Sequence, residues 1–439
     1  MPTLDELPED HPLKNDRAKR RALATVAFTL FLDLAGFGII LPILPYYAES
    51  MHASATMVAL LSTAFSAAQF LMSPVLGRIS DRHGRRPVML LSIAGSIASS
   101  LVLGFAHALW LVFVARLVAG SSKANVSTAH AYVADLIAPE QRAKYMGMMG
   151  AAMGMGFVFG PAIGGLLAID ALPELPFFVA AALSLCNLIM AAIWLPETHF
   201  PQGKGVRPED TQSRATVSAT NLRQAIRSIR GTTMAWLAAI AFCFYLSFAG
   251  MESTMALLSE RLFHWGGRET GLFMTFIGVN MVVFQGVVVG RTVARFGENT
   301  VLALGLGMLA IGMMLLGGVN SLLASVGLPL NDDSGGASVY ALAVYGAGGA
   351  LMSGGNGLTS SALSALVSRV SSTENQGLNM GIKESAASLA RVGGPMMAGP
   401  LFQHVNPGAP MLVGGLIGLL NVKIALALRS RLPRHQERV

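Results

Sequence analysis

The chain has 439 residues, of which 53% are hydrophobic and only 13% are charged. A soluble domain carries about 25% charged residues, so this composition excludes a soluble enzyme and a disordered chain. The net charge of +7 would suit a nucleic-acid-binding protein only if the basic residues formed one face. Here they fall in short segments between long apolar runs, so no nucleic-acid partner is expected. Cys186 and Cys243 both lie inside apolar runs, and no disulfide is predicted.

Apolar runs of about 20 residues, the length that crosses a hydrocarbon core of about 30 Å, repeat along the whole chain. The first run contains Asp33 and two prolines, and no small-residue cleavage site follows it, so it is predicted to be a membrane span and not a signal peptide. The twelve predicted spans are 22–48, 56–76, 88–106, 109–133, 145–168, 175–195, 233–258, 269–290, 299–319, 338–367, 379–401 and 411–428.

The basic residues predict the orientation of these spans. With the N-terminus in the cytoplasm, 24 of the 31 Lys and Arg residues fall in cytoplasmic segments, and the opposite loops hold only Arg261 and Arg268. Positive residues favour the cytoplasmic side. Both termini are therefore expected in the cytoplasm, and the expected location is the inner membrane of a bacterium.

The longest predicted cytoplasmic connection, residues 197–232, divides the spans six and six. Within it Arg223, Arg227 and Arg230 alternate with apolar residues at helical spacing, which fits either an amphipathic helix on the membrane surface or a solvated linker. The predicted organisation is a cytoplasmic tail at 1–21, a six-helix half at 22–196, the linker at 197–232, a second six-helix half at 233–428 and a cytoplasmic tail at 429–439.

The two halves share short motifs. Residues 77–88 read GRISDRHGRRPV and residues 290–301 read GRTVARFGENTV, so that the glycines and two arginines of the first run recur in the second. Further along each half, Gly160 and Pro161 match Gly394 and Pro395. Two parallel six-span halves are typical of the major facilitator architecture, which places its substrate site between the halves near the middle of the membrane. The predicted fold class is therefore an all-α membrane protein with twelve transmembrane helices in two six-helix pseudo-symmetric halves.

Residues 77–88 also resemble the loop signature that major facilitator transporters carry between spans two and three. The resemblance implies a cytoplasmic latch that acts during alternating access, whereas a loop that only supplies positive charge is the plain alternative. Gly77 is expected to let helices approach closely, and Asp81 to accept hydrogen bonds or to face a helix N-terminus. The candidate latch residues are Gly77, Asp81, Arg82, Gly84, Arg85, Arg86 and Asp135.

The fifth predicted span contains the run GMGFVFGPAIGG at 154–165. Three of its glycines are spaced four apart on one helix face, which permits close helix packing, and its proline can bend the span. The run resembles the fifth-span signature of facilitator antiporters, which implies exchange of a solute for a proton; tight packing alone is the alternative. The motif residues are Gly156, Gly160, Pro161, Gly164 and Gly165.

Three further runs resemble the tetracycline and multidrug proton antiporters: LDLAGFGIILPILPYY at 32–47, RLVAGSSKANVSTAHAYVAD at 116–135 and SFAGMESTMALL at 247–258. The acid that tetracycline pumps carry in their third span is replaced by Ser99. Spans eight and nine hold no acidic or imidazole group away from their ends. The resemblance implies a drug:proton antiporter, and the departures favour a small organic solute other than tetracycline.

Charges inside the spans carry the remaining predictions, because each costs about 2.5–3.5 kcal/mol near the bilayer centre. Asp33 lies mid-way along span one and is predicted to be a proton-linked group paired with Arg116, or else half of a purely structural ion pair. Glu252 is a second proton-coupling candidate, a contact for a cationic solute, or a satisfied buried acid. Lys123 would favour an anionic solute. The candidate substrate-cavity residues are Lys123, Asn125, Gln69, Asn280, Asn356, Glu384 and Arg391.

The sequence contains no phosphate-binding loop, no Cys/His cluster and no catalytic motif, so neither ATP, a metal, a cofactor nor an enzymatic activity is expected. The predicted function is secondary active transport, as proton-coupled efflux of a small organic solute by a monomer in the lipid bilayer. An importer or uniporter for a metabolite or metal-related solute is one alternative. A non-transporting membrane sensor or scaffold is the other.

Overall fold

The computed structural model describes residues 16–428 except 124, 138, 170, 199–231, 333–335 and 372–374. The helix considered around Arg223 to Arg230 lies outside the described residues. Described residues are helical apart from turns, loops and one isolated bridge between Asn331 and Ala337. Ten helical segments in this part of the chain are long and apolar enough to cross a membrane by length and composition. Two further helices, α14 (Val339–Val370) and α15 (Gln376–His404), are equally long but richer in glycine and polar residues, so helices lie at all twelve predicted spans.

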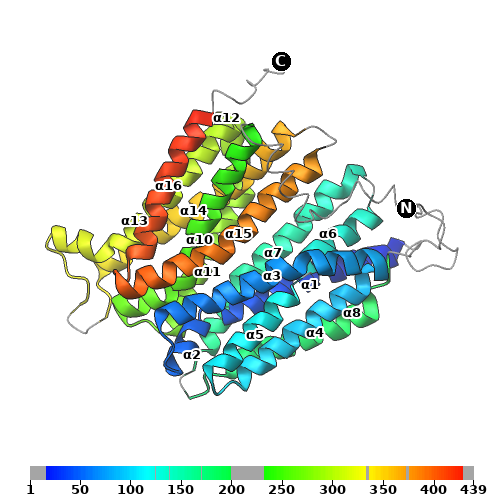
Figure 1. Ribbon diagram of the computed structural model, residues 1–439, viewed down its shortest axis with the longest axis horizontal. Helices are drawn as coiled ribbons and strands as arrows, with labels where there is room; N and C mark the ends of the chain where they lie inside the picture. Colours follow the sequence, from blue (N-terminus) through cyan, green and yellow to red (C-terminus); the bar gives the residue numbers. More distant parts are fainter. Residues whose placement is uncertain are drawn as a thin grey trace. The chain divides into compact units, whose positions relative to one another are not determined.

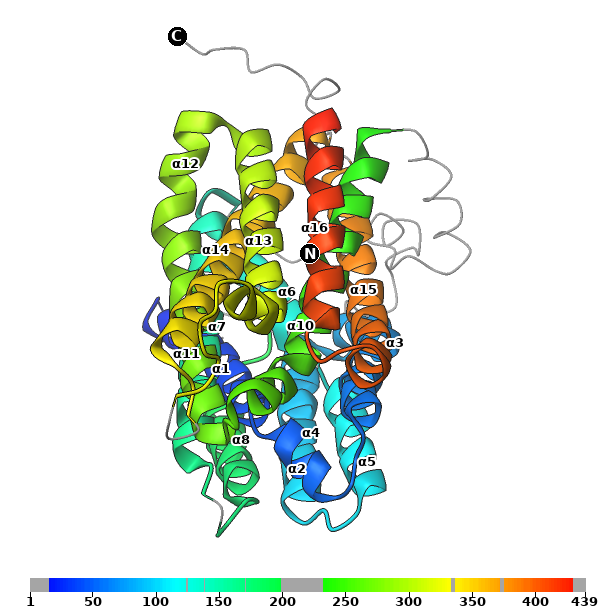
Figure 2. The ribbon, with the colours of Figure 1, turned by 90° about the vertical axis from the view of Figure 1, so that its left-hand side faces the viewer.

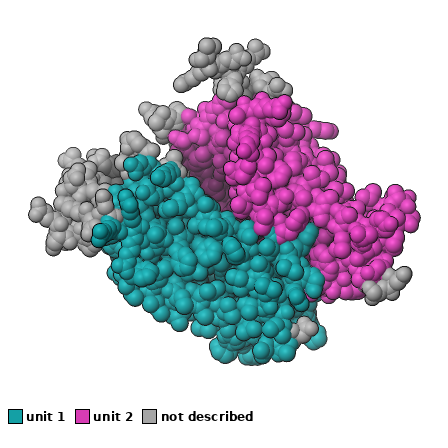
Figure 3. Space-filling view, turned by 180° about the vertical axis from the view of Figure 1, so that it is seen from behind, with its two compact units in different colours: residues 1–52, 64–216, 267–275 teal, residues 53–63, 217–266, 276–439 magenta. Residues whose placement is uncertain are grey.

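The chain forms two compact units, shown in different colours in Figure 3. The first unit contains residues 1–52, 64–216 and 267–275, so it combines the N-terminal half with the beginning of span eight. Its helices, labelled in Figure 1, are α1 (Asp16–Ile40), α2 (Leu44–Ser50), most of α3 (Ala55–His83), α4 (Arg85–Gly104), α5 (Leu109–Ser121), α6 (Asn125–Leu136), α7 (Pro139–Leu167), α8 (Leu175–Trp194) and the start of α11 (Gly267–Val283).

Two spans of the first unit are interrupted. Span one changes from α1 to α2 around Leu41–Ile43, next to Pro42 and Pro45, because proline lacks the N–H that a continuous helix needs. Span four changes from α5 to α6 between Ser121 and Asn125 without any proline, and Lys123 lies in this break. Irregular backbone at membrane depth is tolerated only inside protein or beside a cavity. The break in span four therefore marks a position where function is expected.

Close packing of α7 on α1 explains the glycines of the fifth span. A Cβ atom built on Gly156, Gly160 or Gly164 would lie 2.7 Å or less from a backbone carbonyl oxygen of α1. Glycine is therefore required at all three positions, since any side chain would push the two helices apart. Gly165 differs, because it faces the start of α11, where a Cβ would lie 3.0 Å from the carbonyl oxygen of Arg268.

The second unit contains residues 53–63, 217–266 and 276–439. In it α13 packs against both α14 and α16 (Figure 2). The helices of this unit are the start of α3, α10 (Thr233–Phe263), the second part of α11 from residue 276, the π-helix η4 (Phe284–Val288), α12 (Val289–Phe296), α13 (Glu298–Ser325), α14, α15 and α16 (Ala409–Leu428).

The internal repeat is visible in the backbone of both units. Gly84 and Gly297, which occupy the same position in the two repeated runs, have φ angles of +106° and +76°, and each immediately precedes a helix. Gly394, the counterpart of Gly160, packs against α10 as Gly160 packs against α1, with a Cβ only 2.6 Å from the carbonyl oxygen of Leu246. A glycine with a positive φ before a helix and a glycine at a close contact between two helices therefore each occur in both units.

Candidate functional site

An ion pair joins the first and fourth spans of the first unit. The ammonium nitrogen Nζ of Lys123 lies 2.7 Å from Oδ2 of Asp33, and the Lys123 and Asp33 side chains are only 14% and 3% exposed. The sequence analysis expected Arg116 as the partner of Asp33, so the observed partner corrects that expectation. The break after α5 supplies the reason, because it places Lys123 at the depth of Asp33 on an irregular segment instead of on a regular helix face.

Arg116 lies in α5 among aromatic rings. Its guanidinium carbon is 4.5 Å from the centroid of Phe65 and 5.9 Å from that of Phe37, and its side chain is buried. The Phe37 ring also lies 5.8 Å from Nζ of Lys123. Cation–π contacts of this kind stabilise a desolvated cation by about 2 kcal/mol. Arg116, Lys123 and Asp33 thus lie near one another in the interior of this unit, and the Phe37 ring is close to both cations.

An apolar layer of the first unit packs around the part of α1 that precedes Asp33 and the part of α6 that follows Lys123. It is formed by fully buried side chains that include Val26 and Leu30 of α1, Met89 of α4 and Val133 of α6. Val26 and Leu30 precede Asp33 along α1, and Val133 follows Lys123 along span four.

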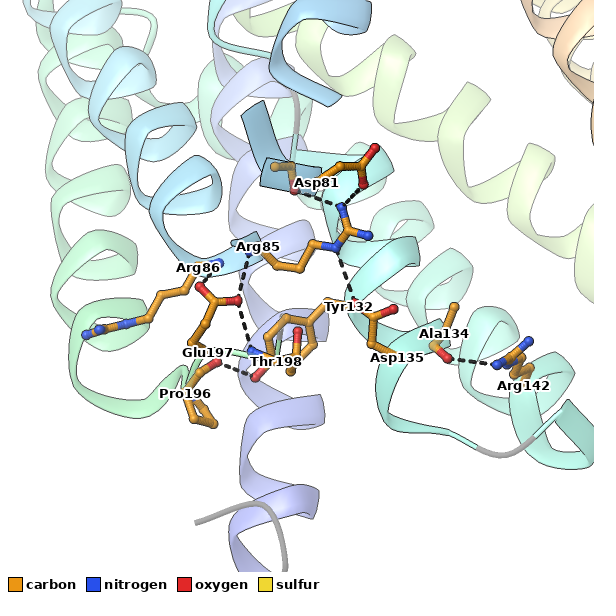
Figure 4. A network of polar contacts seen from close by, with 11 residues as sticks. Asp81, Arg85, Arg86, Tyr132, Ala134, Asp135, Arg142, Pro196, Glu197 and Thr198 are labelled. Atoms are coloured by element: carbon orange, nitrogen blue, oxygen red, sulfur yellow. Dashed lines mark hydrogen bonds and ion pairs between the residues drawn. The ribbon is translucent and has the colours of Figure 1, made fainter. Parts of the chain in front are cut away.

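A polar network surrounds the connection between α3 and α4 in the first unit (Figure 4). The buried Arg85 guanidinium pairs with the carboxylate of Asp81, four residues earlier, and with Oδ2 of Asp135 at 3.2 Å. It also donates a hydrogen bond of 3.2 Å to the Ser80 hydroxyl. Arg85 therefore connects α3, α4 and α6, and the candidate latch residues Asp81, Arg85 and Asp135 meet in one cluster.

Glu197, which the sequence analysis did not select, binds the N-terminus of α4. Its carboxylate accepts hydrogen bonds from the backbone N–H groups of Arg85 at 2.9 Å and of Arg86 at 3.1 Å (Figure 4). A carboxylate is stabilised there by unpaired N–H groups and the helix dipole. Asp81 was expected to accept hydrogen bonds or to face a helix N-terminus; it accepts a hydrogen bond from Arg85, while Glu197 lies at the N-terminus of α4. The acid in LPET at 195–198, directly after span six, is the signal that was missed.

Glu197 also helps to require glycine at position 84. Its φ of +106° disfavours any residue with a side chain, and a Cβ atom there would collide with Oε2 of Glu197. Gly77, by contrast, was expected to permit close packing, and this is wrong for the described conformation because no atom lies within 4 Å of a Cβ built there. Arg82 is exposed, and Arg86 donates from its guanidinium to the carbonyl oxygen of Ala192 at 2.7 Å.

Several candidate cavity residues lie in the second unit. Oδ1 of Asn280 accepts a hydrogen bond of 2.9 Å from Ser353, so it bridges α11 and α14. Asn356 is buried in α14, and Glu252 is partly buried in α10. On α15, Glu384 pairs with Nζ of Lys383 at 2.8 Å, and Arg391 lies against Tyr245.

The other two candidates lie in the first unit. Gln69 is partly buried in α3, and Asn125 is buried at the beginning of α6, two residues after Lys123. Ser99, in the position where tetracycline pumps are expected to carry an acid, donates a hydrogen bond of 2.9 Å to the carbonyl oxygen of Ala115. Among the described residues, no group of three or more His, Cys, Asp or Glu side chains could hold a metal ion.

Known proteins share this architecture. The structure of the human organic anion transporter MFSD10 superimposes with a TM-score of 0.65 and 26% identity, covering 93% of this chain and 99% of that one. A mutant of the nucleoside transporter NupG superimposes with a TM-score of 0.72 at 11% identity, over 94% of this chain and all of its own, which shows a shared fold alone. Helical spans, a paired internal repeat and this shared architecture define the class of the protein as a multi-pass membrane protein with the fold of a transporter.

The sequence comparisons give the family. Residues 26–355 match the family model of the Major Facilitator Superfamily. Tetracycline resistance protein, class D, of Salmonella ordonez is 31% identical over 424 residues, which cover 94% of this chain and 98% of that protein. Tetracycline resistance protein, class C, of Escherichia coli is 30% identical over 87% of this chain and 89% of its own length. The chain belongs to the Major Facilitator Superfamily, is a secondary transporter and not an enzyme, and the predicted fold class and resemblance are confirmed.

Proposed function

We propose that the protein exports a small organic solute in exchange for protons, with Asp33 as the group that binds the proton. The observation that carries this proposal is the buried ion pair between Asp33 and Lys123 at the break in span four. Ionisable residues inside membrane spans commonly mark proton relays and substrate paths. Discontinuous helices mark binding sites in secondary transporters.

The ion pair can couple the movement of a proton to the movement of the solute, because the energy of the pair depends on the charge of Asp33. With Asp33 ionised, both charges are compensated. A proton on Asp33 removes the negative charge and leaves Lys123 buried without it, a situation that costs about 3–5 kcal/mol in buried pairs. The protonated unit therefore favours a rearrangement in which Lys123 finds water or another partner. Exchange follows if only the protonated form and the solute-loaded form change access from one side to the other.

The solute class is inferred from the relatives and from the polar residues of both units. The relatives are described as tetracycline resistance proteins and as an organic anion transporter, which supports a small organic molecule. Ser99 is used to bind α5 and supplies no acid, which supports a solute other than a metal-chelated tetracycline. The proposed cavity residues are Gln69, Lys123, Asn125, Asn280, Asn356, Glu384 and Arg391, with Glu252 as the second candidate for proton coupling.

The proposed setting is a monomer in the bacterial inner membrane with both termini in the cytoplasm. The strong Lys and Arg asymmetry supports that orientation. The cytoplasmic network around Arg85 and Glu197 is the proposed latch, and the N-terminal and C-terminal six-helix halves are the proposed moving parts.

Purified protein in proteoliposomes tests the proposal. With inside-out protein and an internal pH lower than the external pH, a panel of organic acids, amines and neutral drugs is screened for solute uptake together with internal pH. Antiport requires that a transported solute enters while protons leave, so that the internal pH rises. Movement of both in the same direction, or solute movement without any effect of a pH gradient, would contradict it and favour an importer or uniporter.

A further inference from the structure

Arg391 is the basic residue near the middle of α15, and its charge has no acidic partner among the described residues. Its neighbour on the same helix, Lys383, pairs with Glu384 at 2.8 Å, and in the first unit Lys123 pairs with Asp33 at 2.7 Å. The contact of Arg391 is with a ring: its guanidinium carbon lies 4.8 Å from the centroid of Tyr245 in α10. A cation in the middle of a membrane span that has no carboxylate partner in the protein is expected to receive one from a bound molecule.

The position of Arg391 on its helix directs it away from lipid. Leu389 and Met396, seven residues apart, are 54% and 53% exposed and form an apolar face of α15. At about 100° per residue, Arg391 lies about 200° from Leu389 and about 140° from Met396, so it projects from the opposite side. Glu384, also seven residues from Arg391, shares its side of the helix, which makes this the polar face.

The local packing holds Arg391 against Tyr245. Gly393 and Gly394 follow it closely, and a Cβ on Gly394 would lie 2.6 Å from the carbonyl oxygen of Leu246, the residue after Tyr245. The close approach of α15 to α10 at this point therefore sets the guanidinium beside the phenol ring. Phe244 supports the ring from α10, with its own centroid 4.7 Å away.

The stacking of Arg391 on Tyr245 leaves the N–H donors of its guanidinium available for a solute. A guanidinium carries five N–H donors in its plane, and its contact with the face of a ring uses none of them. Two parallel N–H groups match the two oxygens of a carboxylate, a bidentate geometry that lysine cannot offer. Arg391 is only partly buried, so a solute can reach it.

We propose that Arg391, held by Tyr245, binds the carboxylate of the transported solute, which makes the substrate class an organic carboxylic acid in its anionic form. This assignment rests on the proposed transport function and adds the chemical group that is recognised. Glu384 already compensates Lys383, so Arg391 supplies the uncompensated positive charge of α15. An aromatic acid suits the site further, because the Tyr245 ring can stack with a flat solute.

Two isosteric probes test the proposal: 2-naphthoate, which carries a carboxylate, and 2-naphthamide, which does not. Binding of each to the purified full-length protein is measured by titration calorimetry. The wild type is expected to bind 2-naphthoate at least about tenfold more tightly. Arg391→Gln is expected to lose that preference and leave 2-naphthamide binding unchanged, and Arg391→Lys to retain only part of it, because lysine keeps the charge without the planar fork.

Arg295→Gln is the matched control, because Arg295 also stacks on a ring, that of Phe296 at 5.3 Å, but lies near the end of α12. It should keep the preference for 2-naphthoate. The assignment is overturned if Arg391→Gln keeps that preference with wild-type thermal stability, or if the wild type does not distinguish the two probes. Either result leaves proton coupling at Asp33 untouched, since that is read from pH-driven transport, so the two proposals fail independently.

Discussion

Lys123 Nζ approaches Asp33 Oδ2 to 2.7 Å at the one place where span four is not helical among its described residues. The two side chains come from different spans and are both largely buried. Their attraction therefore depends on the local backbone of span four as well as on the charge of Asp33. If Asp33 binds the transported proton as proposed, this ion pair links its charge directly to the helix break of span four.

Replacing Asp33 with asparagine is expected to abolish uphill, pH-driven transport while leaving some downhill exchange. Asparagine nearly keeps the shape of the side chain but cannot take up a proton, and it leaves the Lys123 charge buried without its partner. The same change should lower the free energy of unfolding by about 3–5 kcal/mol. Transport into proteoliposomes with and without a pH gradient, together with thermal unfolding, measures both effects.

Lys123→Met provides the control for that experiment. The double variant, with Asp33→Asn and Lys123→Met, should regain most of the lost stability, because it removes both charges, yet it should still fail in uphill transport. A purely structural pair predicts that the double variant also regains coupled transport. If well-folded Asp33→Asn protein concentrates solute against its gradient, Asp33 is not the coupling residue and Glu252 becomes the leading candidate.

Gly160→Leu in α7 is expected to abolish transport or to make proteoliposomes leak protons. A Cβ at Gly160 already lies 2.7 Å from backbone atoms of α1, so leucine must force α7 and α1 apart. Gly150→Leu on the same helix is the matched control, because nothing lies within 4 Å of a Cβ there. Solute uptake and the decay of an imposed pH gradient are measured for both. Equal, wild-type behaviour would remove the functional role assigned to this glycine.

Gly84→Ala is expected to destabilise the protein more than the equivalent change Gly297→Ala. Both positions have positive φ angles, and strain of this kind costs about 1–3 kcal/mol. Only at Gly84 does the added Cβ also collide with a carboxylate, that of Glu197. Thermal unfolding of the two variants should therefore differ, and adding Glu197→Ala to Gly84→Ala should reduce the difference. Equal stability of the two single variants would exclude the collision.

The spans could be predicted from sequence because the hydrocarbon core imposes length and composition on each one directly. The repeat could be predicted for a similar reason, since glycines such as Gly160 and Gly394 serve the same close contact in each unit. The break in span four could not. No proline marks it, and the residues around Lys123 are small and polar ones that occur in regular helices as well.

The partner of Asp33 could have been predicted by counting residues from the ends of the predicted spans. Lys123 lies nearly as far from the cytoplasmic end of its predicted span, 109–133, as Asp33 lies from the cytoplasmic end of 22–48. Arg116 lies two helical turns farther toward the outer side, so equal depth favours Lys123. Glu197 could not be selected by depth, because it follows span six outside any motif that had been assigned a role, and its importance depends on the tertiary approach to the N-terminus of α4.

The proposed orientation predicts the labelling of a cysteine placed at Asp332, in the loop between spans nine and ten. The background should carry Cys186→Ser and Cys243→Ser, because both natural cysteines are free thiols. In intact cells, a membrane-impermeant maleimide should label the new cysteine from outside. A cysteine at Arg82, which is exposed in the last turn of α3, should react only after the membrane is opened. The reverse pattern would show that the termini are not cytoplasmic.

Asp81 contacts the Arg85 guanidinium, and Glu197 binds the N-terminus of α4. Removing either acid is expected to slow turnover more than it weakens solute binding. Asp81→Ala removes one of the two carboxylates on the Arg85 guanidinium, and Glu197→Gln weakens the charge at the helix N-terminus. Both acids contact Arg85 at the connection between α3 and α4, whereas the proposed proton site joins α1 to the break in span four. Turnover in proteoliposomes and equilibrium binding to purified protein separate the two effects.

The latch prediction depends on this separation, because a latch acts on the rate of the conformational change whereas a binding residue acts on affinity. His83→Ala, at an exposed position in the last turn of α3, is the control and should change neither quantity. A variant of Asp81 or Glu197 that turns over normally but binds solute much more weakly would show that this network belongs to the binding site and not to a latch.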